Sequence, residues 1–208
     1  MVSYSYLFLI FAVIVQRLLE VRISGFHEEA LKARGAAEHA PQQMPVMIAV
    51  HSAWLLGCLV EAWLRAPHTT ARWLTIIALL VFSLGQALRL LAMATLGERW
   101  TVKIITLPGV SPVTHGIFRY LRHPNYLGVV LEIAALPLIV GSWLTALVFS
   151  IANGLLLWWR IGAEERALSD GSDYAERFRK RNRLTPKPGP KTFATRKSST
   201  HEAERTRD

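Results

Sequence analysis

The chain has 208 residues and a formal net charge of +9, and 51% of its residues are hydrophobic. The apolar residues gather in runs of about 20, the length that a lipid bilayer requires, which excludes an ordinary soluble domain. Cys58 is the only cysteine in the sequence, so an intramolecular disulfide is excluded and a metal site is not expected.

Five apolar segments predict the fold class, an all-α integral membrane helical bundle with about five transmembrane helices. They span roughly 4–20, 46–64, 73–96, 126–140 and 142–160. The first lacks the basic start and the clear cleavage site of a signal peptide, so we expect it to be retained as a span. Pro137, Gly141 and Ser142 divide the last two spans, which should form a tight hairpin.

The distribution of Lys and Arg predicts the orientation, because basic loops stay in the cytoplasm. Segments 21–45, 97–125 and 160–208 contain 3, 4 and 13 of the 24 basic residues. Five spans with the N-terminus outside would place all three segments on one side. We therefore expect a cytoplasmic C-terminus and a cofactor site that faces the cytoplasm.

Several polar side chains fall within the predicted spans, where each needs a partner. Arg89 in the third span and Glu132 in the fourth either pair with each other or line a polar cavity. His51 in the second span is expected to bond a neighbouring helix. A further polar cluster is predicted at the cytoplasmic end of the first span, from Gln16, Arg17 and Glu20.

The stretch "GIFRYLRHPNYLG", residues 116–128, places strong hydrogen-bonding side chains directly before the fourth span. Pro124 suits the first turn of a helix, where its missing N–H costs nothing. The helix start then offers free N–H groups and the positive end of a dipole, which favour a carboxylate or phosphate. Arg122 and His123 add donors there. Alone, this stretch fits a basic helix cap as well as a binding site.

A second group of residues follows in "LLLWWRIGAEERAL", at the end of the fifth span. Arg160 and Glu164 stand four residues apart on one helix face, with Glu165 beside them. One explanation of this spacing is a surface ion pair without any function. The short hairpin, however, returns them to the membrane face where the fourth span begins. One rim should therefore hold Arg122, His123, Asn125, Tyr126, Arg160 and Glu164, a constellation suited to a charged cofactor.

These residues resemble the isoprenylcysteine carboxyl methyltransferase family of membrane enzymes. The resemblance rests on the 116–128 stretch, a hairpin, "RIGAEERAL" and "DYAERF", and it covers about residues 97–186. The segments "QRLLEVRIS" and "RWTVKIITLPG" are similar to the bacterial branch, whose members methylate lipid-tailed pyrones and resorcinols made by type III polyketide synthases.

The resemblance implies S-adenosylmethionine as the cofactor and assigns roles to individual residues. Arg160 would face the methyl acceptor as the catalytic residue. Lys103 stands where the family has a glutamine, and "VSP" at 110–112 departs from the eukaryotic pattern. The residues that would bind the cofactor are Val113, Phe118, His123, Pro124, Asn125, Tyr126 and Glu164.

The implied activity is O-methylation of a lipophilic acceptor in the membrane. That acceptor is either a prenylated, isoprenylcysteine-type carboxylate or the acidic hydroxyl of a polyketide lipid such as an alkylpyrone or alkylresorcinol. A carboxylate or an acidic enol is already anionic at neutral pH, so it needs positioning and charge pairing more than a base. An ordinary phenol would need a general base, and the sequence does not identify one. The polyketide reading predicts a functional link to a type III polyketide synthase.

Two other functions share parts of the pattern. Sterol-type NADPH-dependent reductases have a similar stretch, but they usually follow its glycine with an acidic residue where this chain has Val129. A non-catalytic membrane scaffold should bind neither cofactor. Titration with S-adenosylmethionine and NADPH separates the three.

The chain divides into N-terminal membrane helices (1–96), a catalytic core (97–186) and a disordered basic tail (187–208). The basic cluster "ERFRKRNR" at 176–183 is expected to contact the anionic headgroups of membrane lipids. No stacking aromatics accompany it, and nucleic-acid binding is not expected.

Overall fold

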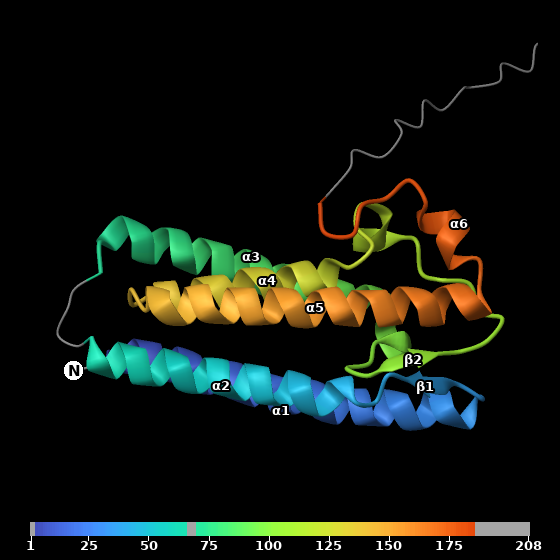
Figure 1. Cartoon of the computed structure of the whole chain (residues 1–208), viewed down its shortest axis with the longest axis horizontal. Coiled ribbons are helices and arrows are strands. Elements are labelled where there is room, and N and C mark those ends of the chain that lie inside the picture. The colour runs from blue at the N-terminus through green and yellow to red at the C-terminus, as the bar shows by residue number, and fades with distance from the viewer. Residues whose placement is uncertain (1–2, 66–69, 186–208) are drawn as a thin grey trace, which may run out of the picture.

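The computed structural model describes residues 3–65 and 70–185. Five long helices run along one axis, α1 (Tyr4–Ala33), α2 (Gln43–Leu64), α3 (Arg72–Leu96), α4 (Pro124–Leu138) and α5 (Trp143–Gly171) (Figure 1). Short elements gather at one end of the bundle, the 3-10 turns η1 (Gly97–Arg99) and η2 (Gly116–Arg119) and the helix α6 (Tyr174–Phe178). The predicted tail, 187–208, lies outside the described residues.

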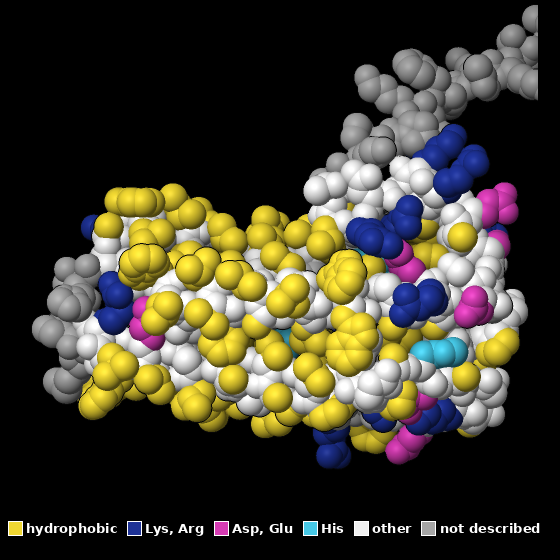
Figure 2. All heavy atoms as spheres, in the orientation of Figure 1, with side chains coloured by type: hydrophobic (Ala, Val, Ile, Leu, Met, Phe, Trp, Pro, Cys, Tyr) yellow, Lys and Arg dark blue, Asp and Glu magenta, His cyan; other side chains and the backbone are white. Residues whose placement is uncertain are grey.

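The prediction of an all-α membrane bundle is confirmed. Helices α2, α3 and α5 are long and apolar enough to cross a membrane, and α4 is a shorter apolar helix. Hydrophobic side chains cover much of the bundle surface seen in Figure 2. Large apolar side chains such as Trp63, Leu80 and Trp158 are exposed. Charged side chains gather mainly at the end that holds α6. The chain is therefore a multi-pass membrane protein, and the crossing of α1 and α4 remains a prediction.

The predicted hairpin is confirmed, with α4 ending at Leu138 and α5 beginning at Trp143. Gly141 in the turn has a φ of +75°, a conformation that favours glycine. The first helix differs from its prediction, because it continues well past residue 20 to Ala33. The extension, residues 21–33, runs to the end of the bundle where the short elements gather (Figure 1).

A small antiparallel sheet was not predicted. Strand β1 (Ala37–His39) pairs with β2 (Ile104–Thr106), with Glu38 opposite Ile105. The sheet joins the α1–α2 connection to the segment that follows α3. His39 Nε2 lies 2.7 Å from Thr106 Oγ1, and Lys103 pairs with Glu38. These contacts hold the 101–106 segment beside the site described below.

Helices α3 and α4 make the most extensive contact of any two elements. Gly85 and Gly128 face each other there, and a Cβ at Gly128 would lie 2.5 Å from Arg89 Cγ and 2.6 Å from the Gly85 carbonyl oxygen. Both distances are too short for a side chain, so glycine permits the two backbones to approach. This contact fixes the position of α4 against α3.

Of the two alternatives predicted for Arg89 and Glu132, the structure shows the pairing, with Arg89 Nη1 donating to Glu132 Oε2 at 2.8 Å. Arg89 also lines a cavity described below. The pair belongs to a larger charge cluster. Arg89 also donates to Glu20, and Arg17 donates to Glu132 and, at 3.1 Å, to Glu20. Gln16 donates to Glu20 at 2.9 Å. Two arginines thus neutralise two glutamates within the bundle and tie α1 to α3 and α4.

Contrary to the prediction, His51 makes no hydrogen bond to a neighbouring helix in the part of the chain that the structure describes. Its Nδ1 lies 2.8 Å from the carbonyl oxygen of Met47, in the preceding turn of α2. The cross-helix bond is made instead by Trp54, whose Nε1 donates to the Ile133 carbonyl of α4 at 3.1 Å. Trp54 and Ile133 are fully buried in the hydrophobic core. The hydrogen bond between helices that was predicted for His51 is therefore made by Trp54.

We predict that Gly128→Ala lowers the stability of the protein by about 1–3 kcal/mol, because the new methyl group must push Arg89 or α3 aside. Gly154→Ala is the matched control, since a Cβ on this glycine of α5 meets nothing within 4 Å. Thermal unfolding in detergent measures both. Equal unfolding temperatures for the two variants would contradict the close α3–α4 contact.

Candidate functional site

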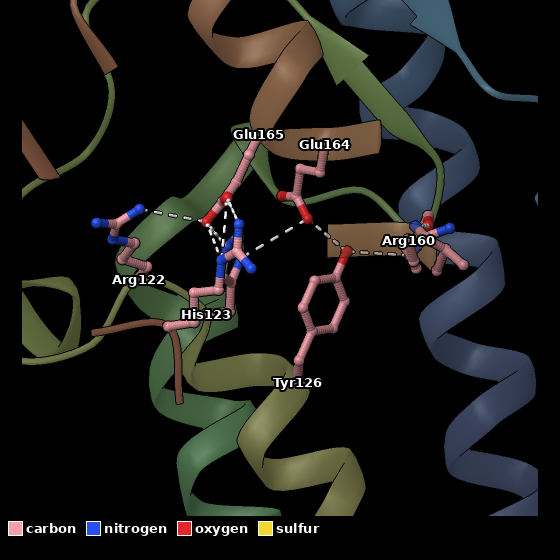
Figure 3. A network of polar contacts seen from close by, with 8 residues as sticks. Arg122, His123, Tyr126, Arg160, Glu164 and Glu165 are labelled. Atoms are coloured by element: carbon pink, nitrogen blue, oxygen red, sulfur yellow. Dashed lines mark hydrogen bonds and ion pairs between the residues drawn. The ribbon is translucent and has the colours of Figure 1, made fainter. Parts of the chain in front are cut away.

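The start of α4 and the last turns of α5 meet at the charged end of the bundle (Figure 3). His123 is the residue before α4, and Pro124 occupies its first turn as predicted. Arg160 and Glu164 project from α5 toward Tyr126 of α4. The hairpin therefore brings the two predicted groups together.

The hydroxyl of Tyr126 is the centre of this meeting. It donates to Glu164 Oε2 at 2.5 Å and accepts a hydrogen bond from Arg160 Nε at 3.0 Å. Arg160 also donates through Nη2 to the Val102 carbonyl oxygen. Within residues 3–65 and 70–185, no ion pair joins Arg160 directly to Glu164, and Arg160 is only 5% exposed. The alternative of a surface ion pair is therefore wrong.

Glu165 forms a second junction that the sequence did not predict. Its Oε1 lies 3.1 Å from His123 Nε2 and 3.4 Å from Arg122 Nη1. Arg183 donates to both carboxylate oxygens, with Nη2 at 2.5 Å from Oε2. A carboxylate only accepts, so His123 donates through Nε2. The His123 ring also stacks on Tyr126, with ring centroids 5.4 Å apart.

Residues 181–183, which we call the C-terminal strap, run beside the segment that leads into α4. The backbone N–H groups of Arg122 and His123 donate to the carbonyl oxygens of Asn182 and Arg183, both at 3.1 Å. Arg122 Nε donates to the Arg181 carbonyl oxygen at 2.6 Å. The hydrogen bond to Glu165 raises the pKa of Arg183 above its usual value. Part of the basic cluster assigned to lipid headgroups thus supports the site.

A cavity of about 160 Å³, the head cavity, opens beside these residues. Six of the eight predicted site residues line it, namely Val113, Phe118, His123, Tyr126, Arg160 and Glu164. Pro124 and Asn125 do not. Pro124 is buried where α4 begins, and Asn125 lines a different cavity.

The head cavity also has lining residues that were not among the predicted site residues. Arg99 and Lys103 add positive charge, and the hydrogen bond from Lys103 to Glu28 raises the pKa of that lysine. Tyr174 and Phe178 of α6 add aromatic surface. Burial raises the pKa of Tyr174, and the nearby negative charge of Glu164 raises this pKa further. One carboxylate, several cations and aromatic faces together suit a zwitterionic ligand with a planar group.

A second cavity of about 290 Å³, the bundle cavity, lies between α1, α2, α4 and α5. Apolar side chains form most of its wall, among them Ile14, Leu18, Met44, Ile48 and Leu156. It shares three lining residues with the head cavity, Thr101, Tyr126 and Arg160. Tyr126 and Arg160 therefore stand between a charged compartment and an apolar one.

Among the residues that the structure describes, no three His, Cys, Asp or Glu side chains are arranged to hold a metal ion. The carboxylates of the site face arginine, histidine and tyrosine instead. The arrangement suits binding of an organic ligand by hydrogen bonds and charge.

Comparison with known proteins finds one family model, the isoprenylcysteine carboxyl methyltransferase (ICMT) family, which matches residues 76–170. The uncharacterized protein YpbQ of Bacillus subtilis is 36% identical over 164 residues, which is 79% of this chain and 96% of YpbQ. An uncharacterized protein of Haemophilus influenzae is 32% identical over 74% of this chain and 88% of its own length. Protein-S-isoprenylcysteine O-methyltransferase A of Arabidopsis thaliana is 26% identical over 84% and 87%.

Among solved structures, the eukaryotic intramembrane Ras methyltransferase ICMT is similar with a TM-score of 0.56 at 24% identity. The match covers 68% of this chain and 52% of that one. This likeness supports the same membrane helical fold.

We predict that Arg183→Ala speeds backbone hydrogen exchange at Arg122 and His123 several-fold, because the strap loses its ionic anchor on Glu165. Lys180→Ala is the matched control, since Lys180 is an exposed basic residue of the same segment. Hydrogen–deuterium exchange on peptides that contain residues 122 and 123 measures the effect. Identical exchange in both variants would mean that the strap does not depend on Arg183.

Proposed function

Because the chain belongs to the isoprenylcysteine carboxyl methyltransferase family of membrane methyltransferases, we propose that it transfers a methyl group from S-adenosylmethionine to a lipophilic acceptor. The observation that carries the proposal is the position of Tyr126 and Arg160 between the head cavity and the bundle cavity. A polar cofactor and a lipid can then meet at one wall, each in a compartment of suitable polarity.

The residues of the head cavity fit the cofactor by their chemistry. S-adenosylmethionine carries an ammonium, a carboxylate, ribose hydroxyls and an adenine ring. Glu164 offers a carboxylate for the cationic or hydroxyl groups, while Arg99 and Lys103 offer positive charge for the carboxylate. Phe118 and Tyr174 offer faces for a planar ring. When bound there, the cofactor would supply an electrophilic methyl group.

His123, Val113 and Phe118 remain in the proposed cofactor site, since they line the head cavity with Tyr126 and Glu164. Pro124 contributes indirectly, because it begins α4 and thereby places Tyr126. Asn125 lines the bundle cavity, so we assign it to the acceptor instead of the cofactor.

Arg160 is the residue proposed to bind the reacting group of the acceptor. Its Nε donates to Tyr126 and its Nη2 to the Val102 carbonyl oxygen, while no hydrogen bond from Nη1 is found within residues 3–65 and 70–185. Two fixed nitrogens hold the guanidinium still, which leaves the third to pair with an anionic oxygen. An acceptor that is already anionic needs this positioning and charge pairing, and no general base.

The acceptor is proposed to be either an isoprenylcysteine-type carboxylate or the acidic hydroxyl of an alkylpyrone or alkylresorcinol. The apolar wall of the bundle cavity supports a lipid tail in both cases. The named relative from Arabidopsis supports the first choice, whereas the polyketide choice, with its link to a type III polyketide synthase, rests on the sequence resemblance. The matched relatives with named activities are methyltransferases, which disfavours a reductase or a scaffold.

We predict that Arg160→Ala and Glu164→Gln impair different steps. Arg160→Ala should chiefly lower turnover or acceptor affinity, and Glu164→Gln should chiefly weaken cofactor binding. Loss of a hydrogen bond to a charged group changes binding roughly ten- to a hundredfold. Steady-state kinetics with each substrate varied separately distinguish the two effects.

Exposed residues near the site provide matched controls for this pair. Arg179→Ala and Glu176→Gln make the same chemical changes on side chains outside both cavities and should leave all kinetic constants unchanged. Wild-type constants in both site variants would contradict the roles assigned to Arg160 and Glu164.

The head cavity and the C-terminus are proposed to face the cytoplasm, because most Lys and Arg residues fall in segments on that predicted side. Alkaline phosphatase, which is active only after export, should therefore be inactive when fused after Asp208. A fully active fusion would reverse the proposed orientation.

A further inference from the structure

The bundle cavity contains a histidine whose tautomer is fixed by its surroundings. His51 Nδ1 lies 2.8 Å from the Met47 carbonyl oxygen. A carbonyl oxygen only accepts hydrogen bonds, so Nδ1 carries the hydrogen. In the neutral ring, Nε2 is then a lone-pair acceptor. No hydrogen bond to Nε2 is found among residues 3–65 and 70–185, and His51 lines the cavity.

Two other polar atoms in residues that line the same cavity also lack partners in the described part of the chain. One is the side-chain oxygen of Asn125, an acceptor, and the other is Nε of Arg89, a donor. Arg89 is only 2% exposed, so bulk solvent does not satisfy it. Both atoms are covered by neighbouring side chains and have no surface open to the cavity, so a ligand there would not reach them. The unpaired acceptor that the wall offers is His51 Nε2, which a bare hydrocarbon chain would leave unpaired.

We propose that the part of the acceptor inside the bundle cavity carries a hydroxyl group, which donates a hydrogen bond to His51 Nε2. This inference rests on the proposed function, because it identifies the bundle cavity as the acceptor site. His51 is then a specificity-determining residue of the bundle cavity. The unpaired Nε2 of His51 in the cavity wall favours a hydroxylated polyketide lipid over an isoprenylcysteine, whose isoprenoid tail is purely hydrocarbon.

The test uses the full-length protein in lipid nanodiscs without any cofactor. The two probes are an alkylresorcinol with a fifteen-carbon chain and its dimethyl ether, which keeps the shape and the oxygens but cannot donate. The wild type should bind the resorcinol about 3- to 10-fold more tightly than the ether, the range that one hydrogen bond provides. His51→Leu should remove most of this preference while its affinity for the ether stays unchanged.

Two more variants make the result specific to the acceptor atom. His51→Gln supplies an amide oxygen and should restore part of the preference, whereas a purely structural role for histidine would not be restored. Met47→Leu changes an apolar lining residue one turn away, keeps the carbonyl that holds His51, and should keep the wild-type preference. Comparing the affinity ratio across variants cancels the different partitioning of the two probes into lipid.

Equal affinity of the wild type for both probes would overturn the inference and indicate that water alone satisfies the polar wall. An unchanged preference in His51→Leu would overturn it as well. Because no cofactor is present, a failure of S-adenosylmethionine binding in a separate titration would count against the proposed function only. A preference that depends on His51 would stand in either case.

Discussion

The hydroxyl of Tyr126 is the interaction on which the site depends, because it connects α4 to α5 through Glu164 and Arg160. Its place follows from a chain of local causes. Gly85 and Gly128 let α3 and α4 approach, Pro124 begins α4, and the hydroxyl then reaches the last turns of α5. The Tyr126 hydroxyl donates a hydrogen bond that stabilises the Glu164 carboxylate, and it accepts one from Arg160, which lines both cavities. A shift of α4 by one turn would separate all three groups.

The buried charges of α1, α3 and α4 give the bundle cavity a polar wall in an otherwise apolar region. Arg89 and Arg17 share Glu132 and Glu20, so the cluster is neutral and tolerable within a membrane protein. The cluster also joins α1 to the rest of the bundle, which closes one side of the cavity. The same residues thus stabilise the helix arrangement and, in the proposed function, contribute to the choice of lipid acceptor. Hydrophobic matching alone would not distinguish between acceptors.

The sequence predicted the features that depend on local patterns, and it missed those that depend on distant partners. Apolar runs located the helices, and Pro124, Gly141 and the spacing of Arg160 and Glu164 located the site. The three-residue strands were too short to show alternation, so the sheet was not predicted.

The role of Arg183 was not predicted either, because its partner Glu165 lies 18 positions away in the sequence and is brought near only by folding. Likewise, His51 bonds the Met47 carbonyl one turn earlier in its own helix, and the sequence does not show which groups of other helices lie within its reach. Adjacent positions can also face different compartments, as Asn125 and Tyr126 do at the start of α4, and the sequence alone could not separate them.

The central claim is that the charged compartment at the end of the bundle holds S-adenosylmethionine. Isothermal titration of the purified wild-type protein in nanodiscs with S-adenosylmethionine, and separately with NADPH, tests it most directly. The account predicts saturable binding of one S-adenosylmethionine per chain and no heat of binding with NADPH. Binding of NADPH, or the absence of S-adenosylmethionine binding by correctly folded protein, would contradict it.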